Sequence, residues 1–327
     1  MSYSAEILTR AKQILESQKS DAQSKYNQRL LEAYEKAPRL REIDKQLRLS
    51  MSVAAKAIFS DGGDPVATME EVKKANLLLQ QERKAILEEN FPPNFLEEEV
   101  VCPHCGGSGY IGSTMCSCLQ TLCRQEQKKE LFQLTRGLET FADFRLDYYP
   151  DTVDRTIGVS PRALMQVNFQ TAQRYARQFA PGCGNLLFSG NTGLGKTFLS
   201  ACIADAVTDK GYSVTYESAP TLFSKLEKNR FNPDDASRAD CNRYENCDLL
   251  IVDDLGTEMS GNFVTAALYA LVNERLLSGK SMLISTNLNI EEIAKRYSPQ
   301  IASRLQGEFT NVVFMGQDIR VLKARGL

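Results

Sequence analysis

The first ninety residues place hydrophobic and polar positions in the pattern of helices. Hydrophobic residues recur three or four positions apart, with Lys, Gln and Glu between them, at Ile7, Ala11, Ile14, Ala22, Tyr26 and Leu30. Pro38 ends this run and a second helix follows it. After a loop at 62–65, a third helix runs from about Val66 to Glu89. The short connections favour a small antiparallel helical unit over residues 1–100.

From residue 185 the pattern changes to short apolar runs that alternate with helical stretches. The runs are Asn185–Ser189, Ser213–Tyr216, Leu249–Val252, Met282–Ser285 and Val312–Phe314. Buried strands separated by helices are typical of a parallel α/β sheet. We therefore predict an α/β domain over 181–327. A cysteine-rich module (101–123) and a linker (124–180), aromatic and acidic in its middle, precede it.

The first predicted strand runs into a complete phosphate-binding loop. The loop matches G-x-x-x-x-G-K-[ST] and consists of Gly190, Asn191, Thr192, Gly193, Leu194, Gly195, Lys196 and Thr197. Glycines let the backbone N–H groups surround phosphates, and the following helix points its N-terminus at them. Lys196 is expected to neutralise the β- and γ-phosphates of ATP and Thr197 to bind Mg²⁺.

Two further strand ends carry polar side chains that suit the same site. Asp253 and Asp254 follow the apolar run Leu249–Val252. We expect Asp253 to hold Mg²⁺ or its water, and Asp254 to orient or deprotonate the attacking water. Asn287 leaves the strand at 282–285 and is expected to position that water. Asn is also common in ordinary turns, so the position of Asn287 after a strand is weaker evidence for this role than the paired aspartates are for theirs.

At this point the chain resembles the AAA+ helicase loaders of the DnaC/DnaI type and the related transposition helper IstB. The matching segments, in order, are NLLFSGNTGLGKTFLS, LLIVDDLGTE, MLISTNL, IASRLQGEF and MGQDIR, and they cover about 185–320. The resemblance implies that Arg304 is an arginine finger for a neighbouring subunit. It also implies that Arg320 acts on ATP in its own subunit, as a second sensor. Most AAA+ proteins carry Glu where this chain has Asp254.

The module at 101–123 has the spacing of a zinc site. Cys102 and Cys105 form C-x-x-C before glycines, and Cys116 and Cys118 follow ten residues later. Two such turns can occupy the corners of a tetrahedron, so we predict Zn²⁺ on these four thiolates, with Cys123 as an alternative ligand. The first half resembles one repeat of the DnaJ-type chaperones. Some loaders also carry a zinc module between their helical and ATPase parts.

Composition limits the remaining functions. The net charge of the 327 residues is −2, which argues against bulk-charge coating of nucleic acid. One histidine, His104, excludes Ser-His-Asp, Cys-His and histidine-based zinc hydrolase sites elsewhere in the fold. The N-terminus has no signal-like apolar run and no stretch approaches a membrane span. Together with the cysteine pattern, this predicts a cytoplasmic protein.

A basic helix after the second strand is a candidate DNA contact. Lys225, Lys228 and Arg230 lie close to one helix face, near Phe223 and Phe231. Cations beside aromatic rings suit single-stranded DNA, and the resembling family contacts DNA in this region. A solvated amphipathic helix explains the same pattern.

The combined prediction is an AAA+ ATPase that loads a replicative helicase. It would bind the helicase hexamer through residues 1–100, contact single-stranded DNA, self-associate through its ATPase domains and hydrolyse ATP for release. The helicase assignment comes from the resemblance. Alternatives are an IstB-like transposition or phage helper, and a nucleotide-gated adaptor that does not turn ATP over.

Overall fold

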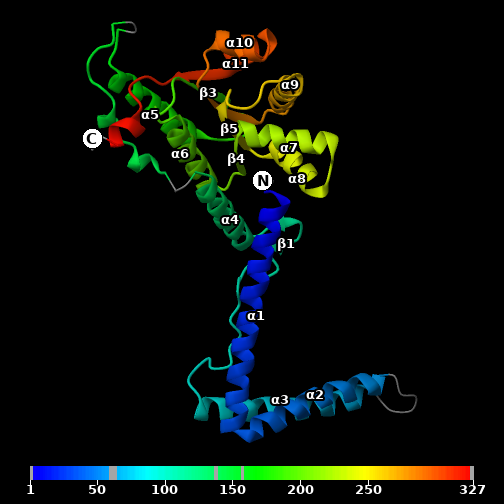
Figure 1. Ribbon diagram of the computed structural model, residues 1–327. Coiled ribbons are helices and arrows are strands. Elements are labelled where there is room, and N and C mark those ends of the chain that lie inside the picture. Colours follow the sequence, from blue (N-terminus) through cyan, green and yellow to red (C-terminus); the bar gives the residue numbers. More distant parts are fainter. Residues whose placement is uncertain (1–2, 59–64, 136–138, 156–157, 325–327) are drawn as a thin grey trace. The chain divides into compact units, whose positions relative to one another are not determined.

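The computed structural model describes residues 3–58, 65–135, 139–155 and 158–324 (Figure 1). Its chain divides into two compact units, one of residues Gln13–Cys116 and the other of Met1–Lys12 with Ser117–Leu327. Within the described residues, no helix is both long and apolar enough to cross a membrane.

Three long helices occupy the N-terminal region, as predicted: α1 (Ala5–Lys36), α2 (Pro38–Ile58) and α3 (Pro65–Asn90). Most of the predicted 62–65 loop lies outside the described residues. In the Gln13–Cys116 unit, a small cluster of Ala33, Leu40 and Phe91 is buried where the helix ends meet. Asp44 accepts hydrogen bonds from Tyr34 and Arg83, each at 2.8 Å, which ties the three helices together.

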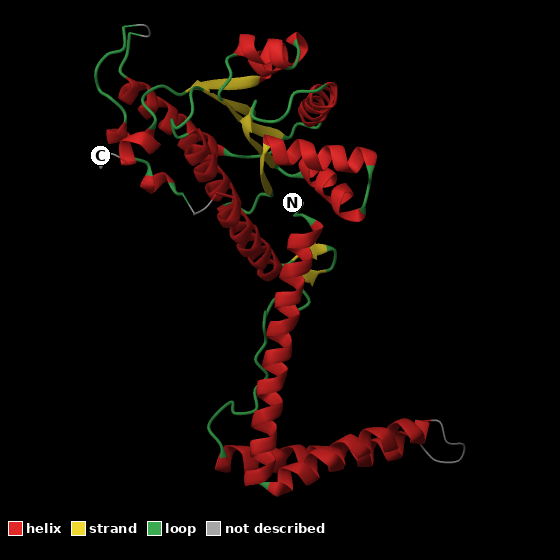
Figure 2. Cartoon of the chain, viewed as in Figure 1, coloured by secondary structure: helices red, strands yellow, loops and turns green. Residues whose placement is uncertain are grey.

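The second unit is an α/β domain built on five parallel strands (Figure 2). The strands are β3 (Asn185–Ser189), β4 (Val214–Ser218), β5 (Leu249–Leu255), β6 (Ser281–Thr286) and β7 (Phe309–Val313). Their order across the sheet is β4-β5-β6-β3-β7. The predicted α/β fold with a parallel sheet is confirmed. Because all pairs are parallel, the carboxyl ends of the strands lie at one edge.

Helices cover both faces of this sheet. Alternate strand residues point to opposite sides: Phe188, Ile251 and Leu283 face the core with α5 (Pro161–Gln178) and α6 (Lys196–Asp209). Leu187, Leu250 and Ile284 face the other core. That side packs against α7 (Ala219–Phe231), α8 (Asp235–Asn246), α9 (Asn262–Leu277), α10 (Ile290–Arg296) and α11 (Pro299–Glu308). Because helices bury both faces of the sheet, the strand sequences are apolar at successive positions and do not alternate with polar residues.

Several of these helices begin at residues that cap their own first turn. Ser160, Ser218 and Ser298 each accept a hydrogen bond from a backbone N–H three residues on, and proline occupies the first or second helical position in each case. Asn289 and Glu292 form a reciprocal capping box at the start of α10. These local signals fix the residues at which the four helices begin.

The stretch 124–180, predicted as a linker, contains regular structure. It holds most of α4 (Ser117–Thr135), two short 3₁₀ turns at Phe141–Asp143 and Leu146–Tyr148, and α5. Gln127 on α4 donates to Thr208 at 2.8 Å, and Lys128 pairs with Asp205 at 3.0 Å. These bonds join α4 to α6, the helix that follows the phosphate-binding loop.

Candidate functional site

The phosphate-binding loop connects β3 to α6 at the carboxyl edge of the sheet. Gly190, Gly193 and Gly195 have φ angles of 140°, 75° and 89°, where side chains are disfavoured. The Lys196 ammonium donates to the carbonyl oxygens of Gly190 and Asn191 at 2.7 and 2.8 Å. Burial lowers the pKa of Lys196, while Asp254 and Asp253 act in the opposite direction. The loop is therefore closed around a partly desolvated cation.

Asp253 and Asp254 lie where the pairing of β5 with β6 is irregular, between Val252 and Leu255. Asp253 is 6% exposed, and its Oδ2 accepts a hydrogen bond from Thr197 at 2.9 Å. Asp254 has a left-handed φ of 55° and lines the cavity in front of the loop. Its backbone N–H donates to Ser285 at 2.9 Å, which holds the bulge. The Asp253 carboxylate is thus buried, whereas the Asp254 side chain lines the cavity.

The electrostatic setting of Asp254 differs from that of an ordinary surface aspartate. Partial burial, and then the neighbouring Asp253, raise its pKa. Lys196 and Arg320 oppose this shift. A carboxyl group whose pKa is raised toward neutrality is a better proton acceptor than a free aspartate, provided that it stays ionised.

The turn after the bulge is anchored by Glu258. Its carboxylate accepts the Gly256 N–H at 2.9 Å and bonds with Arg296 and Tyr297 of α10 and its end. A side chain at Gly256 would meet Leu288 at 2.8 Å and approach the Asn287 Oδ1 at 3.3 Å. Asn287 is the first residue after β6, and its side chain lies beside the turn at Gly256. In the described part of the chain, it is not among the residues that line the cavity.

The two predicted arginines lie in different places. Arg320 lines the cavity, and its side chain bonds Asp318 at 3.3 Å. Arg304, on α11, lies 5.2 Å from the ring centre of Tyr269 and donates to its hydroxyl at 3.3 Å. Arg304 is absent from the described residues that line the cavity. The structure thus brings Arg320, but not Arg304, to the site of its own chain.

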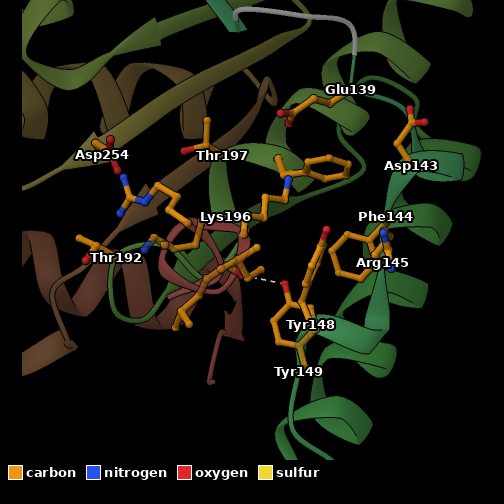
Figure 3. A pocket seen from close by; sticks show the side chains of 17 residues that line it. Glu139, Asp143, Phe144, Arg145, Tyr148, Tyr149, Thr192, Lys196, Thr197 and Asp254 are labelled. Carbon is orange, nitrogen blue, oxygen red and sulfur yellow. Dashed lines mark hydrogen bonds between the residues drawn. The ribbon is translucent and has the colours of Figure 1, made fainter. Parts of the chain in front are cut away.

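A cavity of about 360 Å³ opens in front of the loop (Figure 3). Figure 3 shows side chains of the loop and Asp254 on one side, and side chains from 139–149 on the other. The second wall consists of Glu139, Asp143, Phe144, Arg145, Tyr148 and Tyr149. Phe198, Ile319 and Lys323 also contribute. A cavity with one polar, cationic end and one aromatic wall suits a nucleotide.

Sequence reasoning did not assign this aromatic wall to the site. The segment was noted as aromatic and acidic, but it precedes the phosphate-binding loop by some forty residues. Tyr149 joins the two: its hydroxyl donates to the Leu194 carbonyl at 2.9 Å. The Phe144 ring lies 5.8 Å from that of Phe198 on α6. The close spacing of aromatic residues in 141–149 was the available signal.

The basic helix α7 has its lysines engaged in ion pairs. Lys225 pairs with Glu217 at 2.8 Å and Asp240 at 3.7 Å, and Lys228 pairs with Asp234 at 2.7 Å. Arg230 instead lies over the rings of Phe231 and Phe263, at 5.6 and 5.7 Å. Phe231 is exposed. Of the three candidate DNA contacts, Arg230 is thus the one that lies beside exposed aromatic surface.

The predicted metal ligands meet in one cluster. The thiol sulfurs of Cys102, Cys105, Cys116 and Cys118 all lie within 4.8 Å of one another. Cys102 and Cys116 are 3.8 Å apart, close to the ~3.8 Å that a tetrahedron with 2.3 Å Zn–S bonds requires. The Gly109 N–H donates to the Cys105 sulfur at 3.3 Å, and such a hydrogen bond stabilises the negative charge of a thiolate that binds a metal. These donors fit zinc.

The alternative ligand Cys123 is not part of this cluster of described residues. It is buried in α4, where burial raises its pKa to about 11. His104 is exposed on the turn between Cys102 and Cys105. Geometry therefore separates the four clustered thiols from the neighbouring candidates.

Gly193 offers a test of the loop's packing. A Cβ at this position would lie 2.0 Å from the Asp318 carboxylate, whereas one at Gly211, with a similar φ of 89°, would meet open space. Left-handed strain costs about 1–2 kcal/mol at either position. We expect Gly193→Ala to lower the thermal midpoint by several degrees more than Gly211→Ala, in thermal unfolding followed by circular dichroism. Adding Asp318→Ala should recover part of the difference. Equal losses for the two glycines would contradict this packing.

The α/β domain is similar in sequence to one protein family and to several known proteins. Residues 170–303 match the family described as IstB-like ATP binding protein. The replicative helicase loader DnaC of Escherichia coli K12 is 25% identical over 135 residues, which are 41% of this chain and 55% of DnaC. The uncharacterized protein YdaV of the same strain is 29% identical over 136 residues, 41% of this chain and 54% of YdaV. The chain thus spans about half the length of the curated relatives it matches.

Among solved structures, the DnaC helicase loader aligns with a TM-score of 0.44 and 20% identity, covering 54% of this chain and 98% of that one. DnaI aligns with a TM-score of 0.45 and 19% identity, covering 58% and 93%. The matched residues 170–303 contain the phosphate-binding loop, the β5 bulge and Asn287. Residues 170–303 of the chain thus match the IstB-like ATP binding protein family, and a stretch of 135 residues is similar to DnaC.

Proposed function

We propose that this chain is an ATP-dependent loader that binds a hexameric replicative helicase and helps to place it on DNA. One observation carries the proposal: Thr197, which lines a nucleotide-sized cavity, is hydrogen-bonded to Asp253 in a domain similar to DnaC. ATP binding would drive assembly of the ATPase domains, and hydrolysis would drive release. The ATP site is supported by geometry, and the helicase partner by the relatives.

Each residue of the site has a distinct role in this proposal. Lys196 would neutralise the β- and γ-phosphates, and Thr197 with Asp253 would hold Mg²⁺, which supplies positive charge to the phosphate oxygens. Asp254 would orient or deprotonate water, with Asn287 positioning it. Arg320 can move from Asp318 to the terminal phosphate within the same cavity. The aromatic wall would hold the base.

Arg304 would serve the site of a neighbouring subunit. It lies on α11 and is not among the described residues that line the cavity of its own chain. An arginine that stabilises transition-state charge in trans requires self-association through the ATPase domains. This accounts for the place of the Arg304 guanidinium, which is held over Tyr269 and is not among the described residues that line the cavity.

This arrangement predicts complementation between two inactive variants. Asp254→Asn and Arg304→Ala should each lower ATP turnover at least about 100-fold, measured by phosphate release. Mixing the two should restore part of the activity, because some interfaces then combine an intact Asp254 with an intact Arg304. Arg174→Ala, on an exposed position of α5, is the control. No recovery in the mixture would argue against a finger in trans. A wild type that binds ATP without turnover would favour the adaptor.

The helical region 1–100 is proposed to bind the helicase. Its α3 exposes two adjacent large hydrophobic residues, Leu77 (55% exposed) and Leu78 (67%). Leu31 and Leu49 are also more than half exposed. Exposed leucines on a helical unit are suited to pack against a partner's helices.

Size-exclusion chromatography with light scattering tests this assignment. The chain and its host's replicative helicase should elute as one complex, which is lost when residues 1–100 are deleted. Leu77→Glu with Leu78→Glu should weaken the complex at least tenfold, whereas Leu277→Glu, at a position 77% exposed on α9, should not. If no complex forms with or without ATP, a transposition helper becomes the better account, since the matched family is IstB-like.

Single-stranded DNA is proposed to contact α7 through Arg230 and Phe231. The ring and the guanidinium lie together and are exposed enough to stack on bases. Lys225 and Lys228, also proposed as contacts, would first have to leave their carboxylate partners. Their contribution to phosphate binding is therefore expected to be smaller than that of Arg230.

The cysteine cluster is proposed to bind one structural Zn²⁺. Purified protein should contain about one zinc per chain by mass spectrometry of metal content, because four thiolates close a tetrahedral site. Cys105→Ser should lose the metal and unfold the 101–118 segment. Cys241→Ser, a half-buried thiol on α8 outside the cluster, should keep it. Wild-type protein with less than about a tenth of an equivalent would overturn the assignment.

A further inference from the structure

The buried Asp253 carboxylate is surrounded by hydroxyl groups from three different elements. Thr197 at the start of α6 and Tyr216 on β4 both donate to Oδ2, each at 2.9 Å. Ser285 on β6 donates to Oδ1. Thr197 belongs to the phosphate-binding loop, whereas Tyr216 and Ser285 come from β4 and β6, the two strands beside β5. Together they fill both oxygens of the proposed magnesium carboxylate.

The sheet explains how these groups converge. β5 lies between β4 and β6, and Asp253 pairs in register with Ser218, two residues beyond Tyr216 on β4. Tyr216 therefore points to the same face of the sheet as α6 and reaches the carboxylate from the edge strand. Ser285 approaches from the opposite neighbour and also accepts the Asp254 N–H at 2.9 Å. The Tyr216 and Ser285 hydroxyls thus both come from strands of the sheet.

The Tyr216 side chain is 5% exposed, and its hydroxyl donates to the Asp253 Oδ2 at 2.9 Å. An ionised carboxylate only accepts hydrogen bonds, so the phenol is the donor in this contact. The hydroxyl of Thr197, in contrast, has lone pairs left for a cation while it donates to the same oxygen.

We infer that Tyr216 and Ser285 are positioning residues that hold the Asp253 carboxylate in the orientation needed for Mg²⁺. This rests on the proposed ATP site and extends it to a strand outside its motifs. A carboxylate held by strands on both sides cannot rotate away when the Thr197 hydroxyl turns to the cation. Loss of one of these hydrogen-bond donors would weaken the binding of Mg²⁺ at Asp253 and leave the other contacts of ATP intact.

The test measures how far Mg²⁺ strengthens nucleotide binding. Calorimetric titration with a non-hydrolysable ATP analogue, with and without Mg²⁺, gives the ratio of the two affinities. Tyr216→Phe should reduce this ratio about tenfold, the effect of losing one hydrogen bond to a charged group, and leave the Mg²⁺-free affinity unchanged. Ser285→Ala should do the same. It provides a second test if the tyrosine variant does not fold.

Tyr244→Phe is the matched control. Tyr244 is also buried, and its hydroxyl donates to a carboxylate at 3.0 Å, but that carboxylate, Glu217, is not a proposed ligand of Mg²⁺. It should keep the wild-type ratio. A Tyr216→Phe variant that is folded and also keeps the wild-type ratio overturns the inference. So does an equal loss with and without Mg²⁺, which would indicate a purely structural role. A wild type that does not bind the analogue would instead refute the proposed ATP site.

Discussion

The hydrogen bond between Thr197 and Asp253 is the contact on which the rest of the site depends. It joins residues 56 positions apart. Thr197 begins α6 just after β3 and its loop, whereas Asp253 lies on β5, and β6 separates β3 from β5 in the sheet. The loop after β3 must therefore reach across the end of β6. Where it does so, the hydroxyl of α6 and the carboxylate of β5 define one point, and Lys196, Asp254 and the cavity are placed around it.

The charges at this point balance one another only in part. Lys196 is buried and bonded to two backbone carbonyl oxygens, while Asp253 is held by neutral hydroxyls. Buried charges that lack a full counter-ion are costly, and a polyphosphate with its cation would supply one to each. Arg320 has Asp318 as its partner at the cavity rim. An exposed ion pair of this kind is weak enough to exchange for a phosphate.

The relationship to DnaC and the IstB-like family concerns one part of the molecule. The family match covers residues 170–303, which hold most of the sheet and its polar edge. The three N-terminal helices, the cysteine cluster and the aromatic wall of the cavity all precede it. The helicase contacts proposed for residues 1–100 therefore lie outside the matched region.

The sequence by itself determined the helices before residue 90, the five parallel strands, the phosphate-binding loop and the grouping of the four clustered cysteines. Each depends on local chemistry: apolar periodicity, glycines that accept positive φ, and thiols two or three residues apart. Only the tertiary structure decided that 139–149 forms a cavity wall and that Lys225 and Lys228 are paired. It also decided that Tyr216 and Ser285 meet on Asp253. These are side-chain contacts between segments distant in sequence, and strand order and register, which create them, leave no local pattern.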